Sequence, residues 1–120
     1  MTRSTTCSPP KVLYVEDEVI VALDVADGLS QEFGFEVRVA HNLTAAYQMI
    51  AREDFTFALL DMNLGHGERS TELGKTLAAS GTHVVFASGY NRNEIDEIAN
   101  FQLIEKPFML SDIHKAFTAA

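Results

Sequence analysis

Three things are scarce in this chain of 120 residues, namely cysteine, long apolar runs and basic side chains. The one cysteine, Cys7, lies in the N-terminal segment MTRSTTCSPP, so no internal disulfide can form. A reducing compartment is the usual setting for such a chain, which predicts a cytoplasmic location. No apolar run approaches the roughly 18 residues that a membrane span requires, which predicts no membrane partner. The same N-terminal segment lacks the apolar core of a secretory signal.

Basic residues are outnumbered, with 9 Lys and Arg against 17 Asp and Glu, for a formal net charge of −8. Contacts to phosphate backbones need Lys and Arg, so the charge argues against nucleic acid as a partner. The hydrophobic content is 47% and the mean hydropathy is +0.02, both typical of a globular protein. This length fits one domain. We expect a flexible tail over residues 1–10 and one domain over residues 11–120.

Short apolar runs alternate with segments of helical periodicity along the whole domain. The predicted strands span residues 11–15, 35–40, 55–61, 83–87 and 101–105. The predicted helices span residues 18–33, 43–53 and 71–80, a short segment from Asn91 or Asn93 to about residue 99, and a last segment that begins near Ser111. Gly34 is a helix-ending residue, and Asn42 is a fair N-cap. This βαβαβαβαβα order predicts a parallel sheet covered by helices on both faces.

The first helix carries two apolar stripes rather than one. The core-facing stripe is predicted to hold Val19, Ala22, Leu23, Ala26, Leu29 and Phe33. A second stripe holds Ile20, Val21 and Val25. The second stripe either packs inside the protein or serves as a surface for docking a partner or for dimerisation. The residues leave both interpretations open.

Polar side chains follow the predicted strands where each strand ends. Glu16 and Asp17 follow the first strand, Asp61 ends the third, Ser88 follows the fourth and Lys106 follows the fifth. In an open parallel sheet the carboxyl ends of the strands form the crevice where ligands bind. Three carboxylates gathered there repel one another, so they must hold either protons or a cation.

These residue types suit the movement of a phosphoryl group. A Mg²⁺ ion takes one or two carboxylates and several waters, which Asp17 and Asp61 can supply, with Glu16 reaching the ion through a water. Asp61, at the centre, is the candidate nucleophile for an aspartyl-phosphate. The Lys106 ammonium and the Ser88 hydroxyl can each contact a phosphoryl oxygen. Taken singly, the acids also fit a helix N-terminus, the serine a loop and the lysine a solvated surface.

The full set, with Pro107 and Phe108 after Lys106, resembles the receiver domain of response regulators in two-component signalling, over residues 11–119. That resemblance implies a flavodoxin-like (βα)5 fold with strand order 2-1-3-4-5. It implies that a histidine kinase or phosphotransfer protein phosphorylates Asp61 and so switches the binding of a downstream protein. It also implies Mg²⁺ ligation by Asp17, Asp61 and the backbone carbonyl of Asn63. Ser88 would be the switch hydroxyl, Lys106 would sense the phosphate, and the Lys106–Pro107 bond would be cis.

Some positions depart from the common receiver pattern. Gly65 stands where many receivers have proline, and Leu103 stands where most have an aromatic switch residue. Residues 86–90, Phe-Ala-Ser-Gly-Tyr, are similar to the signature of the FAT GUY receivers, a group of single-domain regulators of alphaproteobacteria. We therefore expect Tyr90 to take over the reporting role together with Ser88.

Several other functions compete with this interpretation. A haloacid-dehalogenase-like phosphatase also uses a strand-end aspartate with Mg²⁺, but that family has a second acid where this chain has Asn63. The chain is also too short for the usual cap of that family. The same residues fit a receiver cut from a hybrid kinase or larger regulator, a phosphate sink, or a degenerate receiver that only binds proteins. We expect a monomer or weak dimer that catalyses its own phosphorylation and dephosphorylation only, and so is not an enzyme in the usual sense.

Overall fold

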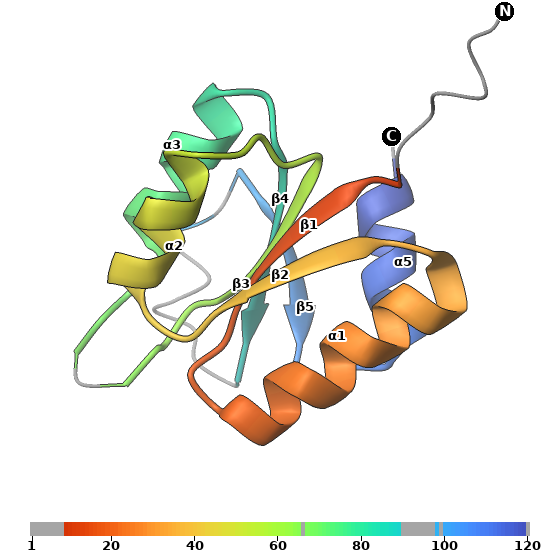
Figure 1. Cartoon of the computed structure of the whole chain (residues 1–120). Coiled ribbons are helices and arrows are strands. Elements are labelled where there is room, and N and C mark those ends of the chain that lie inside the picture. The colour runs from red at the N-terminus through yellow and green to blue at the C-terminus, as the bar shows by residue number, and fades with distance from the viewer. Residues whose placement is uncertain (1–8, 66, 90–97, 99, 120) are drawn as a thin grey trace, which may run out of the picture.

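The computed structural model describes residues 9–65, 67–89, 98 and 100–119 (Figure 1). The strands are β1 (Lys11–Val15), β2 (Glu36–Ala40), β3 (Phe57–Asp61), β4 (His83–Ser88) and β5 (Gln102–Glu105). The helices within the described residues are α1 (Val19–Phe33), α2 (Leu43–Ile50), α3 (Thr71–Ala79) and α5 (Leu110–Thr118). The predicted short helix before residue 99 lies outside the described residues, as does nearly all of the predicted tail.

The strands form one parallel sheet in the order β2-β1-β3-β4-β5, which confirms the predicted flavodoxin-like fold. Helices α1 and α5 cover one face of the sheet, and α2 and α3 cover the other (Figure 1). β2 lies at one edge of the sheet. Its Arg38 forms ion pairs with Glu36 at 2.6 Å and with Glu53 at 3.5 Å, and Glu53 also pairs with Lys11 at 3.0 Å.

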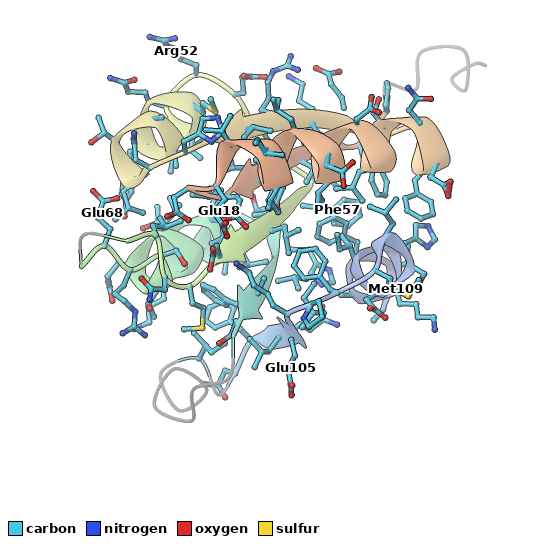
Figure 2. The ribbon with its side chains drawn as sticks, turned by 90° about the horizontal axis from the view of Figure 1, so that it is seen from below. Glu18, Arg52, Phe57, Glu68, Glu105 and Met109 are labelled. Carbon is cyan, nitrogen blue, oxygen red and sulfur yellow. The ribbon has the colours of Figure 1, made fainter. Side chains whose placement is uncertain are left out.

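The sheet separates two apolar clusters, because successive residues of a strand point to opposite faces. On β1, Leu13 and Val15 enter the cluster under α2 and α3, whereas Val12 and Tyr14 enter the one under α1 and α5. The second cluster is rich in aromatic rings. Phe57 lies among them (Figure 2), stacked on Phe117 with ring centroids 4.5 Å apart. Helix α5 presents Ile113 and Phe117 to this cluster on one face.

Helix α1 corrects the predicted stripes. Val19 and Leu23, predicted to face the core, are 50% and 59% exposed, and Val25 instead packs on the cluster. A helix turns about 100° per residue, so a face centred on Ala22 and Leu29 takes in residue 25 and leaves residue 23 to the side. Ile20 lies on the opposite side and is 84% exposed. The apolar side chains that α1 leaves uncovered are therefore Val19, Ile20, Val21 and Leu23.

The predicted helix ends are confirmed where a residue has a specific role. Gly34 adopts the left-handed conformation after α1, at φ 72°, and its N–H bonds to the Ser30 carbonyl. The Asn42 side chain accepts a hydrogen bond from the Ala45 N–H at 2.8 Å. Other boundaries shift by up to three residues. α2 ends at Ile50, β3 begins at Phe57 and β4 extends to Ser88.

Candidate functional site

The carboxyl ends of β1 and β3 bring three acids together. Carboxylate oxygens of Glu16, Asp17 and Asp61 all lie within 4.8 Å of one another, and the described residues contain no second group of this kind. β1 and β3 are neighbours in register, with Val15 opposite Leu60, so the residues that follow meet at the same edge of the sheet. Glu16 is fully buried and Asp61 is 5% exposed, whereas Asp17 is exposed. The sequence prediction of three converging carboxylates is confirmed.

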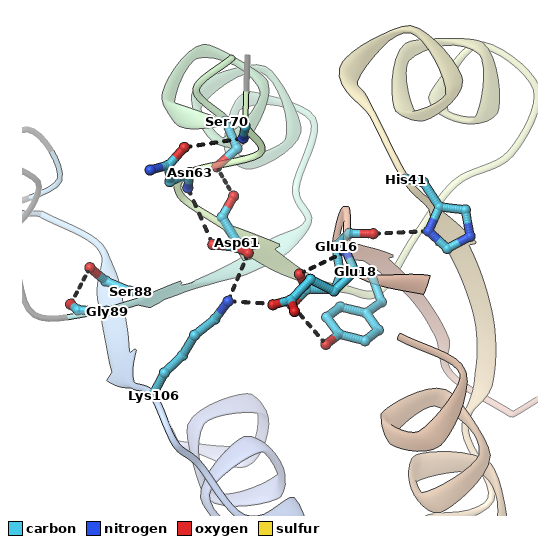
Figure 3. Close-up of polar contacts among 11 residues, drawn as sticks. Glu16, Glu18, His41, Asp61, Asn63, Ser70, Ser88, Gly89 and Lys106 are labelled. Carbon is cyan, nitrogen blue, oxygen red and sulfur yellow. Dashed lines mark hydrogen bonds and ion pairs between the residues drawn. The ribbon is translucent and has the colours of Figure 1, made fainter. Parts of the chain in front are cut away.

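Lys106 follows β5, which β4 separates from β3 in the sheet, and its side chain reaches the acid cluster. Its Nζ donates to Asp61 Oδ2 at 2.7 Å and to Glu16 Oε1 at 3.4 Å (Figure 3). The Lys106 N–H donates to the Ser88 carbonyl at 2.8 Å, which ties this end of the chain to β4. The Lys106–Pro107 bond is cis, as the resemblance implied. One positive charge therefore faces three negative ones.

This imbalance of charge shifts the pKa values of the groups in the site. Burial, with the charge of Asp61 added, raises the pKa of Glu16 to about 7, although Lys106 acts in the opposite direction. Burial by itself lowers the pKa of Lys106, but its hydrogen bond and ion pair with Asp61 outweigh burial and raise it. The acids thus lack positive charge when nothing else is bound, and a cation is the natural complement.

The loop after β3 fixes the orientation of Asp61. Asp61 Oδ1 accepts a hydrogen bond from the Asn63 N–H at 3.2 Å, and the Asp61 carbonyl accepts one from Ser70 Oγ at 2.8 Å. Asn63 forms an isolated antiparallel bridge with Arg69, which closes the loop on itself. Gly65 sits inside the loop at φ 78°, and a Cβ there would lie 3.2 Å from Asp17 Oδ2. The departure from proline at this position therefore leaves room for Asp17.

Glu16 is fixed in place by several donors. Its Oε1 accepts from the Tyr14 hydroxyl at 3.4 Å as well as from Lys106, and its Oε2 accepts from the Glu18 N–H at 3.2 Å (Figure 3). His41 Nδ1 lies 2.9 Å from the Glu16 carbonyl oxygen. Sequence reasoning missed Tyr14, although residues two apart on a strand share a face, so a tyrosine two positions before an acid was a usable signal.

Ser88 ends β4, next to β3 in the sheet, and is 1% exposed. Its hydroxyl donates to the Gly89 carbonyl at 2.7 Å. Tyr90, the expected reporting residue, lies outside the described residues. Leu103 stands at the position of the usual aromatic switch residue. It is partly buried and packs against the cluster under α2 and α3.

The donor set suits a hard divalent cation. All of its members are carboxylates, and such oxygen-only sets bind Mg²⁺ or Ca²⁺ rather than softer metals. Asp17 is exposed and its carboxylate lies close to that of Asp61, so a cation held between them can keep some of its waters. A groove of about 460 Å³ adjoins the acids between α1 and the turn after β5, lined in part by Glu16, Lys106 and Phe108. The three carboxylates can therefore hold a cation, whereas the groove is itself acidic, with Glu16, Glu18 and Asp24 in its lining.

Neither the protein-family models nor the curated proteins give a match to this chain. Among solved structures, a Burkholderia pseudomallei response regulator with a phosphorylated aspartic acid, calcium ion and citrate is 25% identical, with a TM-score of 0.78 over 92% of this chain and 67% of that one. A Thermotoga maritima response regulator is 25% identical, with a TM-score of 0.75 over 93% and 100%. A CheY-like receiver domain protein of Methanospirillum hungatei is 24% identical, with a TM-score of 0.78 over 90% of each chain. The structural neighbours are thus response-regulator receiver domains, and their likeness supports a phospho-acceptor signalling domain.

Within the described residues, no helix combines the length and the apolar character needed to cross a membrane.

Proposed function

We propose that this chain is a receiver domain of two-component signal transduction, in which Asp61 accepts a phosphoryl group from a phosphohistidine of a histidine kinase or phosphotransfer protein. The observation that carries the proposal is the bond of 2.7 Å between Lys106 Nζ and Asp61 Oδ2 inside a group of three carboxylates. An ion pair that only stabilised the fold would need Asp61 and Lys106 alone, without the two further acids beside them. A phosphoryl site needs a nucleophilic carboxylate, a cation site and a positive side chain together.

The transfer is an in-line displacement. A carboxylate oxygen of Asp61 forms a bond to phosphorus while the bond from phosphorus to the donor imidazole nitrogen breaks. The electron pair stays on that nitrogen, which then takes a proton from solvent. Asp17, Asp61 and the Asn63 backbone carbonyl would hold Mg²⁺, with Glu16 reaching it through a water, and the ion would offset charge on the phosphoryl oxygens. Lys106 exchanges its contact with Asp61 for one with a phosphoryl oxygen.

The readout of phosphorylation is proposed to run through Ser88. Its hydroxyl turns from the Gly89 carbonyl toward a phosphoryl oxygen, and Tyr90 reports that movement to a downstream protein. Leu103 lacks the ring that usually does so, which favours placement in the FAT GUY-like group of single-domain regulators. A receiver that drains phosphate from a shared kinase, or one that belongs to a larger regulator, would use the same chemistry at Asp61.

Further parts of the proposal concern the setting of the domain. We place the receiver over residues 11–120, with residues 1–10 as a tail before it, in the cytoplasm of a bacterium and as a monomer or weak dimer. The net charge of −8 favours protein partners over nucleic acid. A phosphatase of the haloacid dehalogenase type is disfavoured because Asn63 contributes no second acid beside Asp61.

Incubation with Mg²⁺ and acetyl phosphate, followed by intact mass, tests this proposal. The wild type should gain one phosphoryl group, and Asp61→Asn should gain none. Beryllofluoride, which mimics a phosphoryl group, should shift NMR signals around the site in the wild type alone. An unmodified wild type, or equal labelling of Asp61→Asn, would show that Asp61 is not the acceptor.

A further inference from the structure

The hydroxyl of Tyr14 is a buried polar group that the proposed chemistry does not use. Tyr14 is 1% exposed, lies on the interior strand β1, and packs in the cluster under α1 and α5. Its aromatic ring serves that cluster, and phenylalanine would serve it equally well. The hydroxyl instead points to the acid cluster, where it donates to Glu16 Oε1 at 3.4 Å.

We propose that Tyr14 is a positioning residue for the cation site, which acts by holding the Glu16 carboxylate in the orientation that faces the cation. This inference rests on the proposed function, because it takes the three acids to be a Mg²⁺ site. It adds a residue that touches neither the cation nor the phosphoryl group.

Three observations support a role through Glu16. Tyr14 and Lys106 both donate to the same oxygen of Glu16, each at 3.4 Å, so that oxygen is held from two sides. The other oxygen accepts from the backbone N–H of Glu18. Because Glu16 is fully buried, its carboxylate cannot exchange these donors for bulk water. Loss of one donor therefore changes the orientation of the carboxylate or leaves it short of a partner.

Tyr14 is a dependable donor in this position. A phenol hydroxyl ordinarily loses its proton only near about pH 10, so the Tyr14 hydroxyl carries a proton to donate at neutral pH. At 3.4 Å the bond is long for an O–H···O contact, so its effect is moderate. Partners that orient the ligands of a metal typically change affinity by roughly 10- to 100-fold, and for this long bond we expect about 3- to 10-fold.

The chain offers a matched control. Tyr47 is on α2, is 40% exposed, and is not among the hydrogen-bond partners of Glu16 in the described residues, so Tyr47→Phe removes a tyrosine hydroxyl without touching Glu16. Isothermal titration calorimetry with Mg²⁺ alone measures binding in the wild type, Tyr14→Phe and Tyr47→Phe. We expect Tyr14→Phe to bind Mg²⁺ about 3- to 10-fold more weakly, and Tyr47→Phe to match the wild type.

A double-mutant cycle distinguishes positioning from a general loss of structure. If Tyr14 acts through Glu16, then adding Tyr14→Phe to Glu16→Gln should weaken Mg²⁺ binding no further, within about 1.5-fold. Labelling of Tyr14→Phe by acetyl phosphate at saturating Mg²⁺ should return to the wild-type rate. Equal Mg²⁺ affinity in the wild type and Tyr14→Phe would overturn this inference alone, as would a full additive effect in the Glu16→Gln background. A wild type that binds no Mg²⁺ would overturn the proposed function and this inference together.

Discussion

Lys106 and Asp61 lie 45 residues apart in the chain, and yet Nζ of the lysine is 2.7 Å from Oδ2 of the aspartate. Asp61 ends β3 and Lys106 follows β5, so the contact reaches across β4, which lies between these two strands in the sheet. The lysine side chain is 30% exposed, so it links the buried acids to the surface of the protein. Because Lys106 also reaches Glu16, this charged centre joins the ends of β1, β3 and β5 at one edge of the sheet.

The first prediction concerns removal of the lysine. Without metal, Lys106→Ala leaves Glu16 and Asp61 buried with no positive partner, so the free energy of unfolding should fall by about 1–2 kcal/mol, as urea denaturation would measure. Lys75→Ala, which removes an exposed ion pair with Glu72, should change it by less than about 0.5 kcal/mol. Mg²⁺ should stabilise Lys106→Ala more than the wild type. Equal losses in the two lysine variants would contradict a special role for the buried charges.

The second prediction concerns pH. Because the pKa of Glu16 is raised from 4.5 to about 7 in the folded protein, folding favours the protonated form. The contribution of Glu16 to stability should be fully present below about pH 4.5 and be lost as the pH rises through about 7. In metal-free urea denaturation, the wild type should lose stability between about pH 5 and pH 8 relative to Glu16→Gln, on the order of 2 kcal/mol. Parallel pH profiles for the two proteins would refute this coupling.

The third prediction uses two glycines with the same backbone conformation. Gly65 and Gly67 both lie at φ 78°, but only at Gly65 would a Cβ approach Asp17 Oδ2, at 3.2 Å. Both alanine substitutions should lower the free energy of unfolding by about 1–2 kcal/mol, because alanine is strained in the left-handed region. Only Gly65→Ala should also weaken Mg²⁺ binding, by displacing Asp17. Calorimetric titration of the two variants tests this, and equal Mg²⁺ affinities would argue that Gly65 affects backbone strain alone.

The fourth prediction concerns the uncovered apolar side chains of α1. Ile20→Ser and Leu23→Ser should leave the urea midpoint nearly unchanged, because both side chains are exposed. Val25→Ser should lose about 1–2 kcal/mol, because Val25 packs on the core. If this face docks the kinase, Ile20→Ser and Leu23→Ser should slow phosphotransfer from the kinase severalfold while labelling by acetyl phosphate stays normal. A normal rate from the kinase would assign these side chains no docking role.

The sequence predicted the sheet and the place of the acids because both depend on patterns local in the chain. Apolar runs of strand length define β1, β3 and β4, and in a parallel sheet the residues just after such runs must meet at one edge. The contact partners within the site depend on side-chain geometry instead. The sequence indicates a core residue at Tyr14, and its ring does pack in the core. The direction of its hydroxyl depends on side-chain geometry, which the sequence alone does not give.

The stripes of α1 were assigned less well, for a related reason. Nearly every residue from Val19 to Val25 is apolar, so periodicity alone does not select the buried face. Packing against the sheet and α5 determines which face of the helix is buried, and that face carries Ala22, Val25 and Leu29. Local sequence patterns also do not predict the conformation of the loop after β3. That conformation depends on the bridge between Asn63 and Arg69 and on the hydrogen bond from Ser70 to the Asp61 carbonyl.

The ion pairs along β2 have a consequence for the behaviour of the protein in concentrated solution. An edge strand offers unpaired backbone groups that can recruit a strand from another molecule and start aggregation. A strand that added to β2 would have to settle beside Glu36 and Arg38 and disturb the pairs that link them to Glu53 and Lys11. A second copy added parallel and in register would also set like charges opposite each other, which is unfavourable. The ion pairs among Lys11, Glu36, Arg38 and Glu53 therefore disfavour the addition of a sixth strand at this edge of the sheet.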